Sequence, residues 1–451
     1  PPHKLEGTLT YIAPEQTGRM NRGIDYRSDF YSLGITFYEL LTNKLPFETT
    51  DPMELVHSHL AQQPLPPHKI IPDIPVAVSN IVKKLLAKIP EERYQSTCGI
   101  KADLETCLNQ LKTKGKISSF TLASQDISEK FYIPKKLYGR EQEVNQLIAA
   151  FEQIANPPKC SIGEMGYGRV RMILISGYSG IGKSALVNEI HKPITQQRGQ
   201  FISGKFEQLQ RDIPYSAISQ AFQDLIRQLL SESDFILKTW KNKILEALGN
   251  NGQIIIDVMP ELEKIIGQQP EVEQLGATES QNRFNLLFQK FLDIFCQKEH
   301  PLVLFIDDLQ WADLPSLNLI EQLITDSGNQ YFLMLGAYRD NEVDLTHPLM
   351  QTLEKINQAQ VIINEITLYP LNIKHINQLI ADTLSCSKEV TKPLAELVAK
   401  KTGGNPFFLT QLLYSLYQEN LLIFNSKYSP QLRGHLWIHV GSIQEDLILL
   451  P

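Results

Sequence analysis

The stretch "GYSGIGKSAL" at residues 177–186 decides the fold, because it matches the pattern GxxxxGK[ST] between an apolar run, "RMILIS", and a helical pattern, "ALVNEI". Glycines at such a turn let backbone N–H groups point inward around a phosphate, and the start of the next helix adds positive potential. The motif therefore predicts a nucleotide site on a strand–loop–helix unit. Its predicted ligands are Gly177, Gly180, Gly182, Lys183, Ser184 and Ala185.

Three apolar segments of this region are predicted strands that each end in polar residues. They are "RMILIS" before the glycine-rich loop, "PLVLFID" before Asp308, and "YFLMLGAY" before Arg339. Longer helical patterns separate them, which indicates a parallel sheet with helices on both faces. Parallel strands end at one edge of the sheet, where ligands bind. We therefore expect the loop, the acidic pair and the arginine to converge there.

The polar residues at these strand ends have predicted roles in phosphate chemistry. Lys183 is expected to reach the β- and γ-phosphate oxygens, and Ser184 and Asp307 are expected to hold Mg²⁺. Asp308 is placed to act as general base on an attacking water, and Arg339 to neutralise transition-state charge. Two structural alternatives stay open: the two aspartates could cap the next turn, and Arg339 could be a surface ion-pair partner. No NKxD-type pattern for guanine follows, which favours adenine.

Length and composition limit the number of domains and the classes of protein that this chain can belong to. A chain of 451 residues exceeds what one hydrophobic core usually organises, so two to three domains are expected. The net charge of -7 argues against a general nucleic-acid or anionic-membrane binder, although local basic patches stay possible. Five scattered cysteines without a CxxC pair suggest reduced thiols and a cytoplasmic protein. No apolar run approaches the 18 residues of a membrane span.

Several motifs in order resemble the STAND class of signal-transducing ATPases, which are related to AAA+ ATPases. They are "LYGREQE", "GYSGIGKSALVNEI", "GKFEQLQRDIPYSAI", "VLFIDDLQWAD", "GAYRDNEV", "ITLYPLN" and "GGNPFFLTQLL", and they span about 137–425. The resemblance implies ATP or ADP as the nucleotide, with Gly139 and Arg140 near the adenine and Pro406 closing the pocket from a helical domain. It also implies Arg339 as the sensor arginine and a switch between ADP and ATP states.

Residues 1–111 resemble the C-terminal lobe of serine/threonine protein kinases. The resemblance rests on "GTLTYIAPEQ" and "DYRSDFYSLGITFYELLTNKLPF". It implies that Glu15 of the APE segment pairs with Arg93, that Thr8 contacts the catalytic aspartate, and that Asp29 begins the central lobe helix. The chain has no glycine-rich kinase loop, VAIK lysine, HRD loop or DFG motif, so this portion by itself cannot phosphorylate anything.

Taken together, these patterns divide the chain into five parts. We expect a kinase-lobe fragment at 1–111, a polar linker at 112–136, a P-loop ATPase domain at 137–366, a helical lid domain at 367–424, and the start of a winged helix at 425–451. Such a chain resembles the large multidomain signalling kinases of cyanobacteria and other bacteria. We interpret it as an internal fragment of a longer protein.

The remaining features favour structural interpretations. His57 and His59 are two residues apart and therefore lie on different faces of a helix, which argues against a metal pair. "GEMGYG" at 163–168 precedes its strand, so a hairpin turn is expected there. The tryptophans are expected to be packing residues: Trp240, Trp311 and Trp437.

Two functions from different classes remain. The first is an ATP-binding, slowly ATP-hydrolysing regulatory switch linked to a serine/threonine kinase, with protein partners or further domains and a possible nucleotide-dependent homo-oligomer. The second is a scaffold that nucleotide stabilises and that recruits partners without significant hydrolysis. A third interpretation, an active protein kinase, requires catalytic segments that this chain does not contain.

Overall fold

The computed structural model divides into two compact units, Arg140–Tyr369 and a second unit made of Pro1–Gly139 with Pro370–Pro451. The residues that it describes are 8–17, 24–49, 52–124, 126, 131–156, 170–197, 199–210, 213–230, 234–273, 275–326, 331–384, 386–424 and 437–439. Within these residues, no helix is long and apolar enough to cross a membrane.

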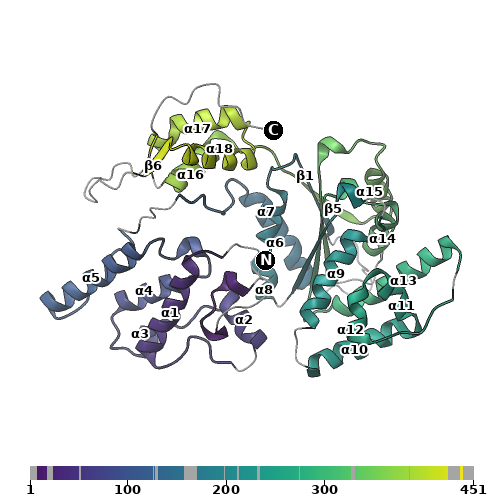
Figure 1. Cartoon of the computed structure of the whole chain (residues 1–451), viewed down its shortest axis with the longest axis horizontal. Helices are drawn as coiled ribbons and strands as arrows, with labels where there is room; N and C mark the ends of the chain where they lie inside the picture. Colours follow the sequence, from purple (N-terminus) through teal and green to yellow (C-terminus); the bar gives the residue numbers. More distant parts are fainter. Residues whose placement is uncertain are drawn as a thin grey trace. The chain divides into compact units, whose positions relative to one another are not determined.

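The N-terminal part of the chain is helical (Figure 1). Its helices are α1 (Arg27–Thr42), α2 (Pro52–Ala61), α3 (Pro67–Ile70), α4 (Val76–Leu85) and α5 (Thr97–Lys114), with short 3-10 turns η1 (Leu9–Tyr11), η2 (Pro14–Thr17) and η3 (Pro90–Glu92). Phe30 on α1 packs into one buried cluster, while Tyr31 and Ile35 pack into another. Helix α1 is therefore buried on more than one face, as the central helix of this lobe.

A glycine allows α1 and α4 to approach closely. A Cβ atom on Gly34 would lie 2.8 Å from Cβ of Leu85 and 3.0 Å from Cδ2 of Leu86. Such a contact is tighter than packed side chains tolerate. The sequence "YSLGITFYELL" thus combines a long apolar helix with one position where only hydrogen fits.

The predicted linker packs against its surroundings in the parts that the structure describes. Helix α5 continues past residue 111 to Lys114, and Ile117 and Phe120 pack against the cluster around Phe30. The Asp126 carboxylate accepts hydrogen bonds from the backbone N–H groups of Gln95 (2.7 Å) and Ser96 (2.8 Å). Polar composition predicted a connector, but its few apolar side chains bury themselves where a neighbouring core is available.

The unit Arg140–Tyr369 is built on a five-stranded parallel sheet in the order β2-β3-β4-β1-β5. Its strands are β1 (Val170–Ser176), β2 (Gln200–Lys205), β3 (Leu302–Asp307), β4 (Phe332–Tyr338) and β5 (Ile362–Thr367). All seven residues of β4 are buried, as expected of an apolar strand at the centre of a parallel sheet. Figure 1 shows α6 and α7 on one face of the sheet and α9 and α14 on the other.

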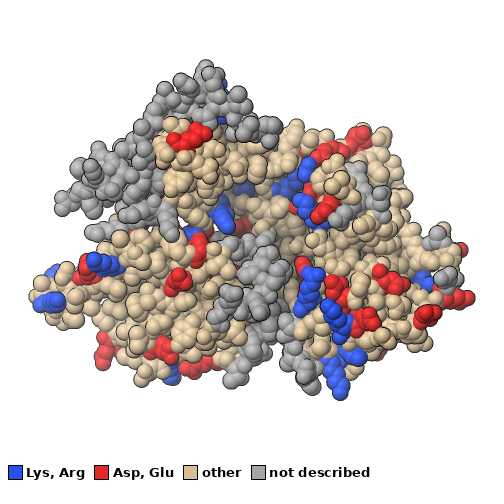
Figure 2. Space-filling view, in the orientation of Figure 1, with Lys and Arg blue, Asp and Glu red and all other residues tan. Residues whose placement is uncertain are grey.

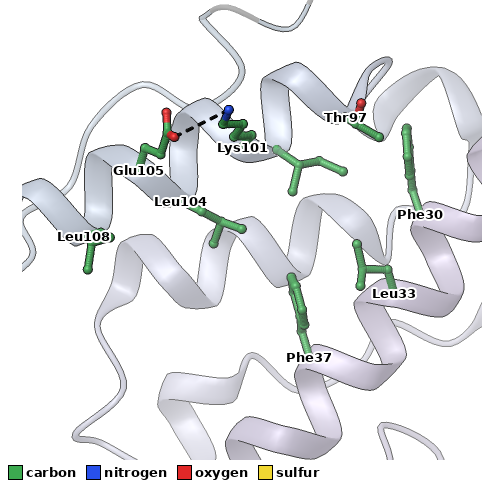
Figure 3. A pocket seen from close by; sticks show the side chains of 9 residues that line it. Phe30, Leu33, Phe37, Thr97, Lys101, Leu104, Glu105 and Leu108 are labelled. Atoms are coloured by element: carbon green, nitrogen blue, oxygen red, sulfur yellow. Dashed lines mark ion pairs between the residues drawn. The ribbon is translucent and has the colours of Figure 1, made fainter.

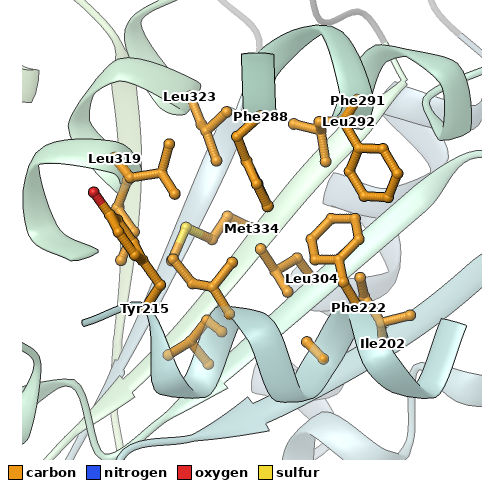
Figure 4. Close-up of a cluster of buried hydrophobic side chains, with 14 of the residues drawn as sticks. Ile202, Tyr215, Phe222, Phe288, Phe291, Leu292, Leu304, Leu319, Leu323 and Met334 are labelled. Atoms are coloured by element: carbon orange, nitrogen blue, oxygen red, sulfur yellow. The ribbon is translucent and has the colours of Figure 1, made fainter. Parts of the chain in front are cut away.

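Helix α6 precedes β1, and the other helices of this unit lie in the connections between the strands. The helices are α6 (Glu141–Ala155), α7 (Lys183–Asn188), α8 (His191–Gln196), α9 (Ser216–Leu229), α10 (Asp234–Leu248), α11 (Gly252–Val258), α12 (Glu263–Ile266), α13 (Ala277–Phe295), α14 (Leu314–Thr325) and α15 (Pro348–Gln358), with 3-10 turns η4 (Gln208–Gln210), η5 (Gly249–Asn251), η6 (Pro260–Leu262), η7 (Leu309–Trp311) and η8 (Asp340–Glu342). Figure 4 shows Phe222 of α9 and Phe288 and Phe291 of α13 over Leu304 and Met334 of the sheet. This core fixes the strand ends that carry the polar residues.

The C-terminal part consists of α16 (Ile373–Leu384), α17 (Lys388–Thr402) and α18 (Pro406–Gln418), followed by strands β6 (Leu422–Phe424) and β7 (Trp437–His439). The two strands pair antiparallel. A buried cluster that includes Ile380, Val398 and Leu413 holds the three helices together.

The predicted fold class is confirmed: a helical kinase-like region, a parallel α/β sheet with a phosphate loop, and a helical lid region. The division into five domains stays a prediction. The predicted hairpin at 163–168 and most of the predicted winged helix at 425–451 lie outside the described residues.

Candidate nucleotide site

The glycine-rich loop follows β1 and leads into α7. Gly177 (φ 145°), Gly180 (φ 74°) and Gly182 (φ 103°) all have positive φ, which side-chain-bearing residues rarely adopt. The buried Lys183 extends across the loop, where its Nζ donates hydrogen bonds to the carbonyl oxygens of Gly177 (2.6 Å) and Tyr178 (3.1 Å). The loop thus places an ammonium group among its own backbone groups, while Ser184 and Ala185 are exposed.

Ser184 and Asp307 meet at this edge of the sheet. The Ser184 hydroxyl donates a hydrogen bond to Oδ2 of Asp307 at 2.9 Å, although the two residues are 123 positions apart in the chain. The contact forms because β1 and β3 are parallel and end on the same side, with β4 between them. A hydroxyl and a carboxylate are hard oxygen ligands of the kind that Mg²⁺ prefers, so these residues fit a magnesium site.

Asp308 lies in a cluster of positive and polar side chains. Its Oδ2 is 3.0 Å from Nζ of Lys205, the last residue of β2, and its Oδ1 is 3.4 Å from Nε of Arg339. Gln310 donates a hydrogen bond to Oδ1 at 2.9 Å and accepts one from the backbone N–H of Arg339 at 3.1 Å. The backbone of Asp308 is left-handed (φ 55°), a conformation that residues other than glycine rarely adopt.

These contacts set the charge state of the cluster. Burial alone would raise the pKa of Asp308, but hydrogen bonds from Gln310 and Lys205 and the charges of Lys205 and Arg339 outweigh it and lower the pKa. The hydrogen bond to Asp308 raises the pKa of Lys205, while burial lowers the pKa of Lys183. Asp308 is therefore a stabilised carboxylate, and it becomes a stronger base only when some of these donors leave it.

Arg339 follows β4 and is partly exposed. Its Nη1 donates to Oε1 of Glu342 at 2.7 Å, and its guanidinium carbon lies 4.7 Å from the ring centroid of Trp311. Trp311 in turn donates from Nε1 to Oε2 of Glu342 at 3.1 Å. The arginine thus contacts both Asp308 and a second carboxylate.

The residues assigned to the adenine belong to two different units. Arg140 lies in the unit of the sheet, where its Nη2 donates to the carbonyl oxygen of Tyr369 and its Nη1 is 3.5 Å from Oε1 of Glu143. Gly139 (φ 63°) and Pro406, the first residue of α18, lie in the other unit. Their roles stay predictions.

The kinase-lobe residues form a closed structural group. Arg93 makes two bonds to the Glu15 carboxylate, Nη1 to Oε1 at 2.6 Å and Nη2 to Oε2 at 2.8 Å, and both side chains are at most 1% exposed. Ser28 also donates to Oε1 at 2.7 Å. Thr8 and Asp29 are exposed. These contacts attach the APE segment to the base of the lobe.

The same lobe has an apolar groove of about 400 Å³ between α1 and α5. Figure 3 shows Phe30, Leu33 and Phe37 of α1 facing Leu104 of α5. The Lys101–Glu105 pair at its border has an Nζ to Oε1 distance of 3.8 Å. The lining is therefore mainly apolar, and its two charged side chains pair with each other.

Charged side chains on the face shown in Figure 2 indicate no second binding site among the described residues. Basic and acidic side chains lie next to each other over the helices from α9 to α13. On α9, for example, Arg227 pairs with Asp224 (3.0 Å) and reaches Glu261 (3.4 Å). Opposite charges that lie this close cancel at short range.

Sequence analysis did not identify four residues of the cluster: Lys205, Gln310, Trp311 and Glu342. Lys205 ends a strand as the identified residues do, but "QFISGK" is too short and too polar to be recognised as a strand of this sheet. Trp311 packs against the hydrophobic core as predicted, and it also contacts Arg339 and Glu342. The signal that could have found Lys205 is its place at the end of a strand that a helix, α9, follows in the chain, the same strand–helix order as Ser176 and α7.

Two family descriptions match the chain. Residues 136–335 match the AAA ATPase domain, and residues 2–104 match the protein kinase domain. The chain therefore contains part of a protein kinase domain fused to an AAA ATPase domain, which is consistent with a nucleotide-binding signalling module.

Three proteins that the chain is similar to are described as kinases. The chain is 33% identical over 502 residues to "Hybrid signal transduction histidine kinase G" of Dictyostelium discoideum, in a match that covers 93% of this chain and 14% of the relative. It is 24% identical over 493 residues to "Peroxide stress-activated histidine kinase mak3" of Schizosaccharomyces pombe, covering 93% of this chain and 20% of the relative. A match to "Serine/threonine-protein kinase PknB" of Mycobacterium leprae is 41% identical over 98 residues and covers 22% of this chain and 15% of the relative. The chain thus spans at most a fifth of the length of these three relatives.

Proposed function

We propose that this chain binds ATP together with Mg²⁺ and acts as a slowly hydrolysing regulatory switch of the STAND class within a signalling kinase. The observation that carries the proposal is the 2.9 Å contact between Ser184 Oγ and Asp307 Oδ2. It joins the two protein ligands expected of a magnesium nucleotide, beside a loop of three positive-φ glycines.

Each residue of the edge has a defined task in this proposal. Ser184 and Asp307 would hold Mg²⁺, which when bound supplies positive charge against the phosphate oxygens. Lys183 leaves the carbonyl oxygens of Gly177 and Tyr178 and donates to the terminal phosphates instead. Asp308 orients a water and accepts its proton, and Arg339 stabilises charge that develops on the leaving phosphate oxygens.

Slow turnover follows from the state of Asp308. A carboxylate that already has Lys205, Gln310 and Arg339 as partners has a lowered pKa and is a weak base. Hydrolysis therefore requires a rearrangement of this cluster before the proton transfer. Slow hydrolysis suits a switch, because the ATP state then persists long enough to be sensed.

The test compares two variants of the whole chain. Lys183→Ala should abolish ATP binding, measured by titration with a fluorescent ATP analogue, because no other ammonium lies inside the described loop. Asp308→Asn should retain binding and lower phosphate release by roughly 100-fold or more. Lys101→Ala, on exposed α5, is the matched lysine control and should change neither quantity. Normal phosphate release by both site variants would refute the assignment.

One observation favours a second function, a scaffold without significant hydrolysis. Asp308 is so fully occupied by its partners that the cluster could persist in the ATP state. Parallel measurement of phosphate release and of mass by light scattering separates the two functions. A scaffold would assemble with ATP and release almost no phosphate, whereas a switch would release phosphate and return to its ADP state.

A further inference from the structure

Arg339, Trp311 and Glu342 form a closed triangle of contacts. Arg339 contacts the face of Trp311 and donates to one oxygen of Glu342, while Trp311 donates to the other oxygen of Glu342. Each residue therefore touches the other two. Removal of any one of these side chains leaves the other two without the partner that they share.

The triangle joins two turns that follow neighbouring strands. Trp311 ends η7, which follows β3 and Asp308. Arg339 follows β4 and precedes η8, and Glu342 ends η8. Asp308, which follows β3, and Arg339, which follows β4, are thereby held with Nε of Arg339 3.4 Å from Oδ1 of Asp308. Packing of the strands alone would leave a long arginine side chain free to choose other rotamers.

Two carboxylates share the guanidinium unequally. The Glu342 side chain is 31% exposed and makes the shorter contact, 2.7 Å, while the Asp308 side chain is 5% exposed and lies at 3.4 Å. A partly exposed ion pair contributes little net free energy, because water and other anions can replace either partner. Of the two carboxylates, Glu342 is thus the one that an incoming anion can displace at low cost.

We propose that Trp311 and Glu342 are positioning residues for Arg339, and that the terminal phosphate of a bound nucleoside triphosphate competes with Glu342 for the guanidinium. The inference rests on the proposed function, since it requires a nucleotide at the adjacent loop. Displacement separates Arg339 from Trp311, so the indole becomes a reporter of the triphosphate state. A diphosphate lacks the competing group and leaves the triangle intact.

The experiment reads Trp311 emission in a chain that carries Trp240→Phe and Trp437→Phe. With Mg²⁺ and a non-hydrolysable ATP analogue, the emission should change in intensity and wavelength, and with ADP it should stay within error of the nucleotide-free spectrum. Glu342→Gln should bind the analogue about fivefold or more tightly relative to ADP, a coupling of the usual size between linked sites. Glu354→Gln, an exposed glutamate of α15, is the matched control and should behave as the parent.

Three results would overturn the inference. They are an equal emission change with ADP and the analogue, an emission change that persists in Arg339→Gln, and an unaltered preference in Glu342→Gln. If the double tryptophan background fails to fold, Trp311→Phe in the otherwise unchanged chain should remove the nucleotide-dependent part of the emission, and retention would count against the inference. Binding of the analogue without any change in Trp311 refutes this inference alone, whereas absence of nucleotide binding refutes the proposed function with it.

Discussion

Two charged clusters of this chain use similar side chains in opposite ways. In the N-terminal lobe, Arg93 and Glu15 form a buried bidentate pair that is complete within the lobe. At the edge of the parallel sheet, Asp308 pairs with Lys205 and shares Arg339 with Glu342, and the Lys205 side chain is 54% exposed. The comparison teaches that a buried pair with every donor satisfied serves structure, while an open cluster with exchangeable partners can respond to a ligand.

The largest expected effect comes from breaking the buried pair of Glu15 and Arg93. Glu15→Ala leaves the Arg93 charge buried without its partner, which should lower the free energy of unfolding of the lobe by about 3–5 kcal/mol. Urea unfolding followed by pulse labelling of Cys107 measures this, because that thiol is 5% exposed in the folded lobe. ATP binding in the other unit should be unchanged.

The control for Glu15 is Glu105→Ala, which removes an exposed glutamate of α5 that pairs with Lys101. It should shift the unfolding free energy by less than about 1 kcal/mol. Equal effects of the two substitutions would contradict the structural role of the buried pair.

A second substitution addresses the open cluster. Ser184→Ala removes one of the two oxygens assigned to Mg²⁺. It should raise the Mg²⁺ concentration needed for half-maximal support of ATP binding by roughly 10–100-fold, the usual loss of affinity when a metal site is damaged. Ser184→Thr keeps the hydroxyl and should behave as the parent chain. The measurement is an ATP titration at a series of Mg²⁺ concentrations, and a threonine variant as defective as the alanine variant would argue against a ligand role.

The smallest expected effect is a pH dependence of the free energy of unfolding of the N-terminal lobe. Lys88 is buried, and its Nζ donates to the carbonyl oxygen of Ser58 (3.1 Å); burial and the charge of Arg93 lower its pKa to about 7. The unfolded chain keeps the higher, usual lysine pKa, so between pH 7 and 9 it binds more protons than the folded lobe. The free energy of unfolding should therefore rise by about 1 kcal/mol per pH unit in this window.

Lys88→Met supplies the comparison for that prediction. It removes the titrating group while keeping a long side chain, so the Cys107 labelling experiment should give a flatter pH dependence from pH 7 to 9 than the parent chain. Identical slopes in the two chains would show that another group dominates.

Sequence reasoning succeeded where a rule of geometry applies to all strands alike. The ends of "RMILIS", "PLVLFID" and "YFLMLGAY" were expected at one edge, and the parallel sheet confirms that expectation. The contact of Ser184 with Asp307 follows from it. The rule needs only apolar runs and the direction of parallel strands, both of which a sequence reveals.

Sequence reasoning did not predict contacts that depend on the path of a turn. Trp311 and Glu342 meet because two 3-10 turns bring them together, and no pattern of spacing encodes that meeting. The same limit applies to the polar segment 112–136, whose Ile117 and Phe120 pack on a core that only the folded lobe presents. Tertiary packing decides such contacts, and local composition does not.

The most direct test of the central claim is a map of where the phosphates of ATP lie on the chain. An ATP analogue with an acyl group on its terminal phosphate transfers that group to a nearby lysine, and mass spectrometry identifies the modified residue. The account predicts modification of Lys183 or Lys205, suppressed by excess ATP. Competable modification of other lysines, with both of these unmodified, would contradict it.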